Sequence, residues 1–354
     1  MFVETTDAPD ALTQVMEPID NRLHEVTSEV RSQWIKVDPE LGEPFDALAE
    51  LVLIGGKRLR PAFFHWAHVG AGGVPFDPLA VDAGAAIEML HAFALAHDDI
   101  MDASSSRRGH PTVHVRFAEI HRRNQWHGDP ERWGEAVAIL VGDLAHVLAD
   151  HLMHTTNPEI AAIWSELRLE VNVGQYLDVL ASAKGEVGEE AARRIVEYKT
   201  GRYSVQRPLH LGAALAGRID DLRADLTAYG QPVGIAFQLR DDILGAFGDS
   251  EVTGKPVGDD LREGKPTPLL ATARRLATPA QTALLSQAGD TDMSEADLAD
   301  LQQAMLDTGA VDVIESEISD LTNEAMTVLG RVELAENAGE ALGDLATFVA
   351  YRSH

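Results

Sequence analysis

The sequence predicts an all-α protein, and three observations support that prediction. Apolar residues recur at helical spacing through most of the 354 residues, whereas the alternating pattern of a half-buried strand is nearly absent. Glycine and proline interrupt the helical pattern at Gly55-Gly56, 70–78, 128–130 and 254–264, where we expect turns and loops. No repeat of fixed period and no low-complexity linker divides the chain. We therefore expect residues 1–354 to form one large helical domain.

The expected helices are the longest stretches of this pattern, each rich in alanine, leucine and valine with polar residues at helical intervals. They cover residues 79–102, 134–155, 158–184, 188–216, 218–247 and 310–350. The segment 121–134 (HRRNQWHGDPERWG) is polar and contains Gly-Asp-Pro, so we expect a loop between helices there. Helical bundles build metal and cofactor sites from the side chains of facing helices.

Composition restricts the class of protein. Hydrophobic residues make up 45% of the chain, which indicates a folded globular protein. Cysteine is absent, which excludes disulfides and thiolate metal sites and fits a reducing compartment such as the cytoplasm. The formal net charge of −28 disfavours nucleic acid and anionic membranes as partners. The N-terminus lacks the features of a secretory signal, and no uninterrupted apolar run predicts a transmembrane segment.

The most informative residues are Asp98, Asp99 and Asp102, which follow the apolar run AAIEMLHAFALAH. In a helix, Asp98 and Asp102 lie one turn apart on the same face. At the mouth of an apolar pocket, two carboxylates about 6 Å apart would repel by about 3 kcal/mol, so we expect a cation there. An array of carboxylate oxygens suits Mg²⁺. A solvated acidic helix end is the alternative, and this motif alone does not exclude it.

A second acidic helix end occurs farther along the chain, in FQLRDDILGAFGD. Gln238, Asp241, Asp242 and Gly245 share one stripe of i, i+3, i+4 and i+7 spacing. Two such helix ends could hold metal ions between them, and two unrelated acidic ends become the less favoured alternative. Because Gly245 provides no carboxylate, we expect the second cluster to bind metal more weakly than the first.

Basic clusters stand out in so acidic a chain. GGKRLRP places Lys57, Arg58 and Arg60 beside two glycines, which allow backbone N–H groups to approach an anion closely. A helix stop followed by a proline that begins the next helix would explain the same residues. Arg107 and Arg108 follow DDIMD after ASSS, so a turn could bring both guanidinium groups back to the aspartates. Ordinary salt bridges within the acidic cluster are the alternative for this pair.

Two further segments carry residues suited to phosphate oxygens. YKTGRYS contains Lys199 and Thr200, and the glycine-rich segment 249–268 contains Lys255 and Lys265. Segments of the second kind often close over ligands, although a single lysine in a loop is usually just solvated. Two carboxylate clusters combined with several cationic ones match a diphosphate bound through metal ions.

Together these motifs resemble the trans-isoprenyl diphosphate synthases, the polyprenyl synthetase family. The resemblance extends from about Gly55 to Pro268 and keeps the order of the family's motifs. It consists of GGKRLRP, HDDIMDASSSRRGHP, GQYLD, KTGRYS, FQLRDDILGAFGD and TGKPVGDDLREGKPT. DDxxD alone is unspecific, but its combination with RRG, the upstream GGKRxRP and the downstream QxxDD is highly specific.

The resemblance implies an isoprenoid synthase-type helical bundle around a deep central cavity, and a homodimer. It implies a prenyltransferase of isoprenoid biosynthesis that joins isopentenyl diphosphate head-to-tail to an allylic diphosphate. Three Mg²⁺ ions would bind the allylic diphosphate, with Mn²⁺ as a substitute metal. Loss of the diphosphate leaves a carbocation, the double bond of isopentenyl diphosphate attacks that cation, and a proton is then lost.

The resemblance also implies roles for individual residues. Mg²⁺ would be held by Asp98, Asp102 and Asp241, and Asp99 and Asp242 would complete the catalytic carboxylates. The allylic diphosphate would be contacted by Arg107, Lys199, Thr200, Gln238, Lys255 and Lys265. The isopentenyl diphosphate site would be formed by Lys57, Arg60, His91 and Arg108, although His91 on an apolar helix face could instead be a core histidine. Gln175 and Asp178 in GQYLD would support the metal-binding face by hydrogen bonding.

The helix in front of DDIMD would set the length of the product. Ala94 lies four residues before Asp98, about 6 Å away along the same face, and is too small to close a tunnel. Phe93 flanks that face, and Leu90 lies one turn farther from the aspartates. Chains of the family with a bulky residue at the position of Phe93, a small residue at that of Ala94 and no insertion within DDxxD resemble geranylgeranyl diphosphate synthases. We therefore expect a twenty-carbon product, with farnesyl or longer-chain diphosphates as alternatives.

Two other functions share the motif or the fold. A class I terpene cyclase also uses DDxxD and Mg²⁺, but it normally needs an Asn/Ser/Glu metal motif that FQLRDDILGAFGD lacks. A non-catalytic partner subunit would explain Gly245, where the family usually has aspartate, but would not explain the intact first motif. We expect an active enzyme whose dependence on Mg²⁺ is altered by Gly245.

Overall fold

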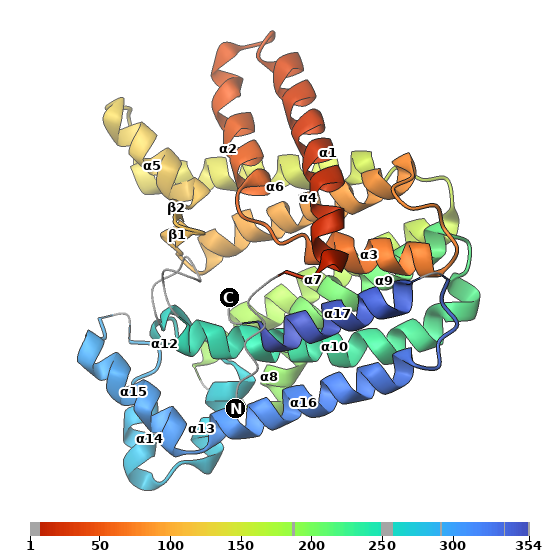
Figure 1. Ribbon diagram of the computed structural model, residues 1–354. Helices are drawn as coiled ribbons and strands as arrows, with labels where there is room; N and C mark the ends of the chain where they lie inside the picture. Colours follow the sequence, from red (N-terminus) through yellow and green to blue (C-terminus); the bar gives the residue numbers. More distant parts are fainter. Residues whose placement is uncertain (1–7, 186–187, 249–257, 291, 336, 353–354) are drawn as a thin grey trace. The chain divides into compact units, whose positions relative to one another are not determined.

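The computed structural model describes residues 8–185, 188–248, 258–290, 292–335 and 337–352, and it is built almost entirely of helices (Figure 1). Within these residues the one sheet is a two-stranded antiparallel hairpin, in which Ser106 pairs with Pro111 and Arg107 with His110. The prediction of an all-α protein is therefore confirmed.

The chain forms two compact units, each with many internal contacts. The N-terminal unit consists of Asp10–His65 and Val74–Thr156. The C-terminal unit consists of residues 8–9, Trp66–Gly73 and the described residues from Asn157 onward. Helix α3 (Leu59–Gly70) runs from the first unit into the second.

The N-terminal unit is arranged around α4, which carries the DDIMD motif at its end. Its elements are α1 (Asp10–Trp34), η1 (Pro39–Leu41), α2 (Gly42–Leu53), α4 (Pro78–Met101), β1 (Ser106–Arg107), β2 (His110–Pro111), α5 (Val113–Arg123) and α6 (Pro130–Leu152). Helix α4 packs against α1, α2, α5 and α6. Gly84 allows α1 to approach α4, because a Cβ atom at this position would lie 2.6 Å from Ile19 Cδ1.

Helix α4 is apolar on all sides because it is a core helix. Among the described residues it is the one helix long and apolar enough to cross a membrane by length and composition, although the sequence predicted none. However, 61% of its most apolar window is buried inside the protein. Burial of that kind is typical of the central helix of a globular domain.

The segment 121–134 is only partly the predicted loop. Helix α5 ends at Arg123, and α6 already begins at Pro130. Asp129 caps α6, because its side chain accepts hydrogen bonds from the backbone N–H groups of Glu131 and Arg132. The Asp-Pro pair is therefore the start of a helix, with proline in the first turn, and not a turn within a loop.

The C-terminal unit is arranged around α10, which carries the second aspartate motif. Its elements are α7 (Pro158–Lys184), α8 (Glu189–Ile195), η2 (Val196–Gln206), α9 (Arg207–Leu215), α10 (Ile219–Phe247), α12 (Asp259–Arg262), α13 (Pro268–Leu276), α14 (Pro279–Leu285), α15 (Glu295–Asp307), α16 (Ala310–Leu329) and α17 (Ala338–Tyr351). Helix α10 contacts η2, α9, α16 and α17. One apolar core in this unit joins α10 to α13, α15 and α16, with Leu239, Leu269, Leu301 and Ile314 all buried.

Two of the predicted helices are interrupted in the structure. The stretch 188–216 is divided into α8, the π-helix η2 and α9, and the stretch 310–350 is divided into α16 and α17. Gly201 in η2 and Gly234 in α10 approach each other closely, since a Cβ atom on Gly234 would lie 2.5 Å from the Gly201 carbonyl oxygen. The π-helix η2 therefore packs directly against the backbone of α10. This contact joins segments far apart in the sequence, so helical periodicity does not predict it. π-Helical segments occur frequently at functional sites.

Candidate functional site

The first aspartate motif lies where α4 ends. The backbone N–H of Asp102, the C-cap residue, donates to the carbonyl oxygen of Asp98 at 2.8 Å, so these two residues lie one turn apart, as predicted. The Asp98 side chain is 19% exposed. Asp99 is only 1% exposed and is directed away from that face toward a different partner.

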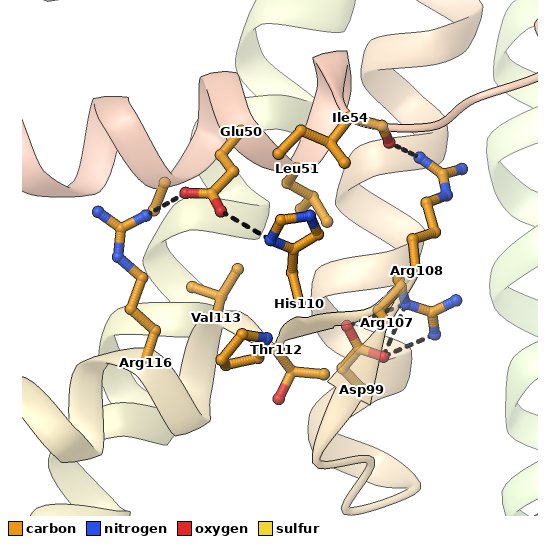
Figure 2. Close-up of a pocket in the computed structure, with 12 residues that line it drawn as sticks. Glu50, Leu51, Ile54, Asp99, Arg107, Arg108, His110, Thr112, Val113 and Arg116 are labelled. Atoms are coloured by element: carbon orange, nitrogen blue, oxygen red, sulfur yellow. Dashed lines mark hydrogen bonds and ion pairs between the residues drawn. The ribbon is translucent and has the colours of Figure 1, made fainter. Parts of the chain in front are cut away.

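Arg107 is the partner of Asp99. Its Nη2 and Nε atoms donate to Asp99 Oδ1 at 2.6 and 2.8 Å (Figure 2). Its Nη2 also lies 3.9 Å from Asp98 Oδ2. Burial alone would lower the pKa of Arg107, but Asp99, Asp98 and Asp102 together raise it, so the guanidinium stays charged. The turn expected after DDIMD therefore returns Arg107 to the aspartates, whereas the guanidinium of Arg108, expected there as well, donates to the carbonyl oxygen of Ile54.

The β1–β2 hairpin that carries Arg107 and Arg108 is anchored on α2. Arg108 Nη1 donates to the carbonyl oxygen of Ile54, and His110 Nδ1 lies 3.8 Å from Glu50 Oε1 (Figure 2). Arg116 Nη1 donates to the other oxygen of Glu50 at 2.6 Å. These residues line a pocket beside Asp99. Burial lowers the pKa of Arg108 to about 10, with Glu88 opposing the decrease, so Arg108 remains a cation at neutral pH.

In the GGKRLRP segment, Arg58 has a structural role, whereas Lys57 and Arg60 are candidates for binding an anion. Arg58 is 2% exposed and donates to Asp20 at 2.6 Å and to Glu88 at 2.9 Å. Arg58 has a positive φ of 55°, a strained conformation for a residue with a side chain. The buried pair with Glu88 thus fixes the turn from which Lys57 and Arg60, both half-buried, extend.

His91 lies in the electrostatic field of the predicted isopentenyl diphosphate site. Burial lowers its pKa well below the ordinary value, and the charges of Arg60 and Arg108 lower it further. His91 is therefore neutral at pH 7. The structure thus brings together His91, Arg60 and Arg108, three of the four residues predicted for that site, within the N-terminal unit.

The second aspartate motif, in the C-terminal unit, occupies the last turns of α10. Gln238 Nε2 donates to Asp242 Oδ1 at 2.8 Å, as their spacing predicted. Asp242 is 4% exposed, and its Oδ2 atom accepts no hydrogen bond from the described residues. Burial raises the pKa of Asp242 well above its ordinary value, Asp260 and Asp241 raise it further, and Gln238 and Lys265 oppose them. A cation bound beside Asp242 would relieve this unfavourable burial.

Asp241 is paired with a residue that the sequence did not single out. Its carboxylate accepts a hydrogen bond from Arg352, whose guanidinium lies over the Phe237 ring at 4.5 Å. Two other partners were also missed: Glu88, which binds Arg58, and Asp260, which lies beside Gly245. Glu88 carried a signal, because a lone carboxylate within the apolar run AAIEMLHAF needs a buried partner.

The candidate phosphate-binding residues of the C-terminal unit are placed by close backbone packing. Lys199 on η2 donates to Asp178 Oδ2 at 2.6 Å, and Thr200 beside it is half-buried. Gly174 on α7 allows the backbone of η2 to approach α7 at Lys199, since a Cβ atom on Gly174 would lie 2.4 Å from the backbone nitrogen of Lys199. Lys265 lies 3.0 Å from Glu263 and 3.3 Å from Asp260, whereas Lys255 lies outside the described residues.

The donor groups of both motifs suit Mg²⁺ bound together with a phosphate ligand. Among the described residues, no three His, Asp or Glu side chains already form a complete metal cluster. Mg²⁺ does not require one, because it usually takes one or two carboxylates and fills its other positions with water and substrate phosphate oxygens. The buried Asp242 oxygen without a hydrogen bond supports the fit.

The residues predicted to set product length line the α4 side of its contact with α6. Leu90 is fully buried, and Phe93 and Ala94 are half-buried. The Phe93 ring lies 4.7 Å from the His97 ring and 4.9 Å from the His146 ring of α6. Phe93 therefore has a fixed position one turn away from the first aspartate motif.

Comparisons with known proteins agree with this arrangement. The family model for polyprenyl synthetase matches residues 42–305. The chain is 33% identical to the geranylfarnesyl diphosphate synthase of Aeropyrum pernix over 84% of its own length and 91% of that protein. It is 31% identical to the short chain isoprenyl diphosphate synthase of Methanothermobacter thermautotrophicus over 98% of both chains.

Solved structures show the same similarity. The geranylgeranyl pyrophosphate synthase of Corynebacterium glutamicum, complexed with isoprenyl diphosphate and magnesium, superimposes with a TM-score of 0.91. The two sequences are 36% identical, and the match covers 96% of this chain and 99% of that one.

Proposed function

Because this chain belongs to the polyprenyl synthetase family, we propose that it forms geranylgeranyl diphosphate from isopentenyl diphosphate and an allylic diphosphate. The enzyme class is that of the trans-prenyltransferases. One observation carries the proposal for the site. Asp98 and Asp102 lie one turn apart, and the Arg107 guanidinium lies 3.9 Å from Asp98, so metal-binding carboxylates and an anion-binding cation are adjacent.

Each predicted residue keeps its role in this proposal. Three Mg²⁺ ions, or Mn²⁺ as a substitute, would be held by Asp98, Asp102 and Asp241. The allylic diphosphate would be bound by Arg107, Lys199, Thr200, Gln238, Lys255 and Lys265. Isopentenyl diphosphate would be bound by Lys57, Arg60, His91 and Arg108. Support comes from the charge of Arg107 and Arg108, the neutral state of His91, and the buried oxygen of Asp242 without a hydrogen bond.

The chemistry that these residues provide is mainly electrostatic. When bound, Mg²⁺ supplies positive charge that stabilises the departing diphosphate. Arg107 adds a guanidinium that Asp99 already holds in place, so little reorganisation is needed as negative charge develops. Neutral His91 can donate one hydrogen bond to an anion without adding a like charge beside Arg60 and Arg108.

Phe93 supports a twenty-carbon product. Its ring is held between His97 and His146, so it can act as a rigid floor for the growing chain. Farnesyl and longer-chain diphosphates remain alternatives, because relatives with each kind of product name are similar to this chain.

The decisive test is a product assay. Purified protein is incubated with isopentenyl diphosphate, Mg²⁺ and, in turn, five-, ten- and fifteen-carbon allylic diphosphates, and the chain length is measured by mass. A twenty-carbon diphosphate that disappears in the D98A/D102A variant is expected. A cyclic hydrocarbon would indicate a terpene cyclase, and silence with every primer would indicate a non-catalytic partner subunit.

We also propose that the protein is a cytoplasmic homodimer whose two units form one catalytic domain. Helix α6 supports the dimer, because Ile139, Leu140 and Val147 are 41%, 60% and 63% exposed. Light scattering of the purified protein checks the mass, and a monomer at micromolar concentration would contradict the proposal.

A further inference from the structure

Glu170 on α7 binds two arginines of the following segments with a single carboxylate. Its Oε1 atom accepts hydrogen bonds from Arg202 Nη1 at 2.8 Å and from Arg207 Nη2 at 2.7 Å. Its Oε2 atom accepts a third hydrogen bond, from Arg207 Nε at 2.7 Å. Burial alone would raise the pKa of Glu170, but the hydrogen bonds from Arg207 and Arg202 lower it below its ordinary value. Glu170 is therefore an ionised carboxylate that joins α7 to η2 and to the start of α9.

The spacing of these two arginines matches a π-helix and not an α-helix. Arg202 and Arg207 are five residues apart, and the backbone N–H of Arg207 donates to the carbonyl oxygen of Arg202, which is the i→i+5 bond of a π-helix. Glu197, five residues before Arg202, accepts a hydrogen bond from Arg202 Nε at 3.0 Å. In an α-helix, residues five apart would point about 140° away from each other. One carboxylate could then not bind both arginines, so the contacts of Glu170 stabilise the π-helical form of η2.

The same helix η2 carries Lys199 and Thr200, which are proposed to contact the allylic diphosphate. Glu170 lies in one row of α7 side chains with Gly174 and Asp178, at positions i, i+4 and i+8. The backbone nitrogen of Lys199 would lie 2.4 Å from a Cβ atom on Gly174, and Lys199 Nζ donates to Asp178 Oδ2 at 2.6 Å. A shift of one residue in helical register would turn the Lys199 side chain by about 100°. The direction of Lys199 therefore depends on the register that Glu170 stabilises.

We propose that Glu170 is a positioning residue for the allylic substrate: it holds η2 in the π-helical register and thereby directs Lys199 and Thr200 at the diphosphate. The proposal rests on the proposed function, because Lys199 and Thr200 must contact that diphosphate. Both oxygens of Glu170 bind guanidinium groups, so its effect on the substrate passes through η2. Loss of the Glu170 charge should therefore weaken the binding of the allylic substrate.

The experiment measures substrate binding and not turnover. An unreactive thiolo analogue of farnesyl diphosphate, with sulfur in place of the bridging oxygen, is titrated calorimetrically into the full-length protein in the presence of Mg²⁺. E170Q keeps the volume of the side chain and removes its charge. We expect about tenfold weaker binding of the analogue, since a displacement of about 1 Å can cost up to about 100-fold. R202Q, which breaks the same link from η2, should have a similar effect.

A double-variant cycle separates positioning from stability. If Glu170 acts through Lys199, E170Q should weaken binding by less than about twofold in a K199A background. E166Q is the matched control, because Glu166 lies on the same helix and its Oε2 atom is 3.0 Å from Arg207 Nη1, but its side chain is 54% exposed. It should leave the affinity for the analogue unchanged. Thermal unfolding measures the stability of each variant separately.

The outcomes are distinguishable. Wild-type affinity in E170Q overturns the proposal, and R202Q decides in the same way if E170Q does not fold. The proposal is also overturned if the effects of E170Q and K199A multiply, or if E166Q weakens binding as much as E170Q. Wild-type protein that shows no Mg²⁺-dependent binding of the analogue would instead refute the proposed function, and the role of Glu170 with it.

Discussion

The guanidinium of Arg352 pairs with the carboxylate of Asp241, 111 residues earlier in the chain. Arg352 is 4% exposed, lies 4.5 Å from the centre of the Phe237 ring, and donates to the carbonyl oxygen of Val349 at 2.9 Å. The end of α17 thus places a fixed positive charge on the residue proposed to bind the third metal ion. Mg²⁺ at Asp241 must either share this carboxylate with Arg352 or displace it.

Replacing Arg352 with methionine should therefore strengthen Mg²⁺ binding. Removal of a like charge beside the ion should raise Mg²⁺ affinity several-fold. The measurement is a calorimetric titration of Mg²⁺ into the protein at a saturating concentration of an unreactive prenyl bisphosphonate. The melting temperature should fall, because the buried Arg352 guanidinium loses its contact with the partly exposed Asp241 carboxylate. R331M, at an exposed arginine, is the control for loss of charge alone. Weaker Mg²⁺ binding in R352M would mean that Arg352 positions Asp241 for the metal.

The Asp99–Arg107 pair should contribute to both stability and catalysis. D99N leaves the buried Arg107 guanidinium without its carboxylate and should reduce the free energy of unfolding by about 3 kcal/mol. In D99N/R107Q the loss should be smaller than the sum of the two single losses, as measured by urea unfolding. D102N, at the partly exposed end of α4, should change stability little while abolishing Mg²⁺-dependent turnover. Additive stability losses in the double variant would show that the pair is not energetically coupled.

Replacing Phe93 with alanine should lengthen the product. The change opens the space now filled by a ring between His97 and His146, so five-carbon additions can continue past twenty carbons. Mass analysis of the diphosphates gives the distribution of chain lengths. F93L, which keeps most of the side-chain volume, should retain the wild-type product. An unchanged distribution in F93A would exclude Phe93 as the floor.

His210 should make the folded protein sensitive to mild acid. Burial lowers its pKa to about 3, with Arg207 and Arg223 contributing, whereas the unfolded chain titrates near 6.5. Below pH 6.5 His210 therefore binds a proton in the unfolded state but not in the folded state. The free energy of unfolding falls as the pH decreases, until the pH reaches about 3. The expected loss from this group between pH 7 and pH 5 is about 2 kcal/mol.

The comparison variant for this effect is H210Q. His210 Nε2 lies 3.0 Å from Thr227 Oγ1, and glutamine can keep a hydrogen bond there without titrating. Glu170, whose pKa is lowered from 4.5 mainly by Arg207 and Arg202 against the opposing effect of burial, affects stability only at lower pH. Urea unfolding at pH 7 and pH 5 should thus show a smaller loss in H210Q. Equal losses in the two proteins would mean that His210 does not control acid stability.

The sequence predicted those parts of the site that depend on local spacing. Asp98 and Asp102 lie one turn apart, and Gln238 binds Asp242, because side chains four residues apart in a helix are neighbours. The return of Arg107 was also predicted, since only a short turn separates it from the aspartates.

Contacts between distant segments could not be predicted in this way. Arg352 with Asp241 and Asp260 beside Gly245 depend on how helices pack, and periodicity carries no information about that packing. The same limit explains why the π-helical segment η2 within 188–216 was not predicted, since its close backbone contact with α10 is a long-range one.

The contact between Gly201 and Gly234 has a consequence for how such chains diverge. Gly234 cannot accept a side chain while the backbone of η2 stays where it is, because its Cβ atom would lie 2.5 Å from the Gly201 carbonyl oxygen, whereas a Cβ atom on Gly201 would make only ordinary contacts at 3.4 Å or more. A substitution at Gly234 should therefore occur together with a change in the π-helix that holds Lys199 and Thr200. An alignment of relatives should show Gly234 replaced only where the segment that corresponds to η2 also differs.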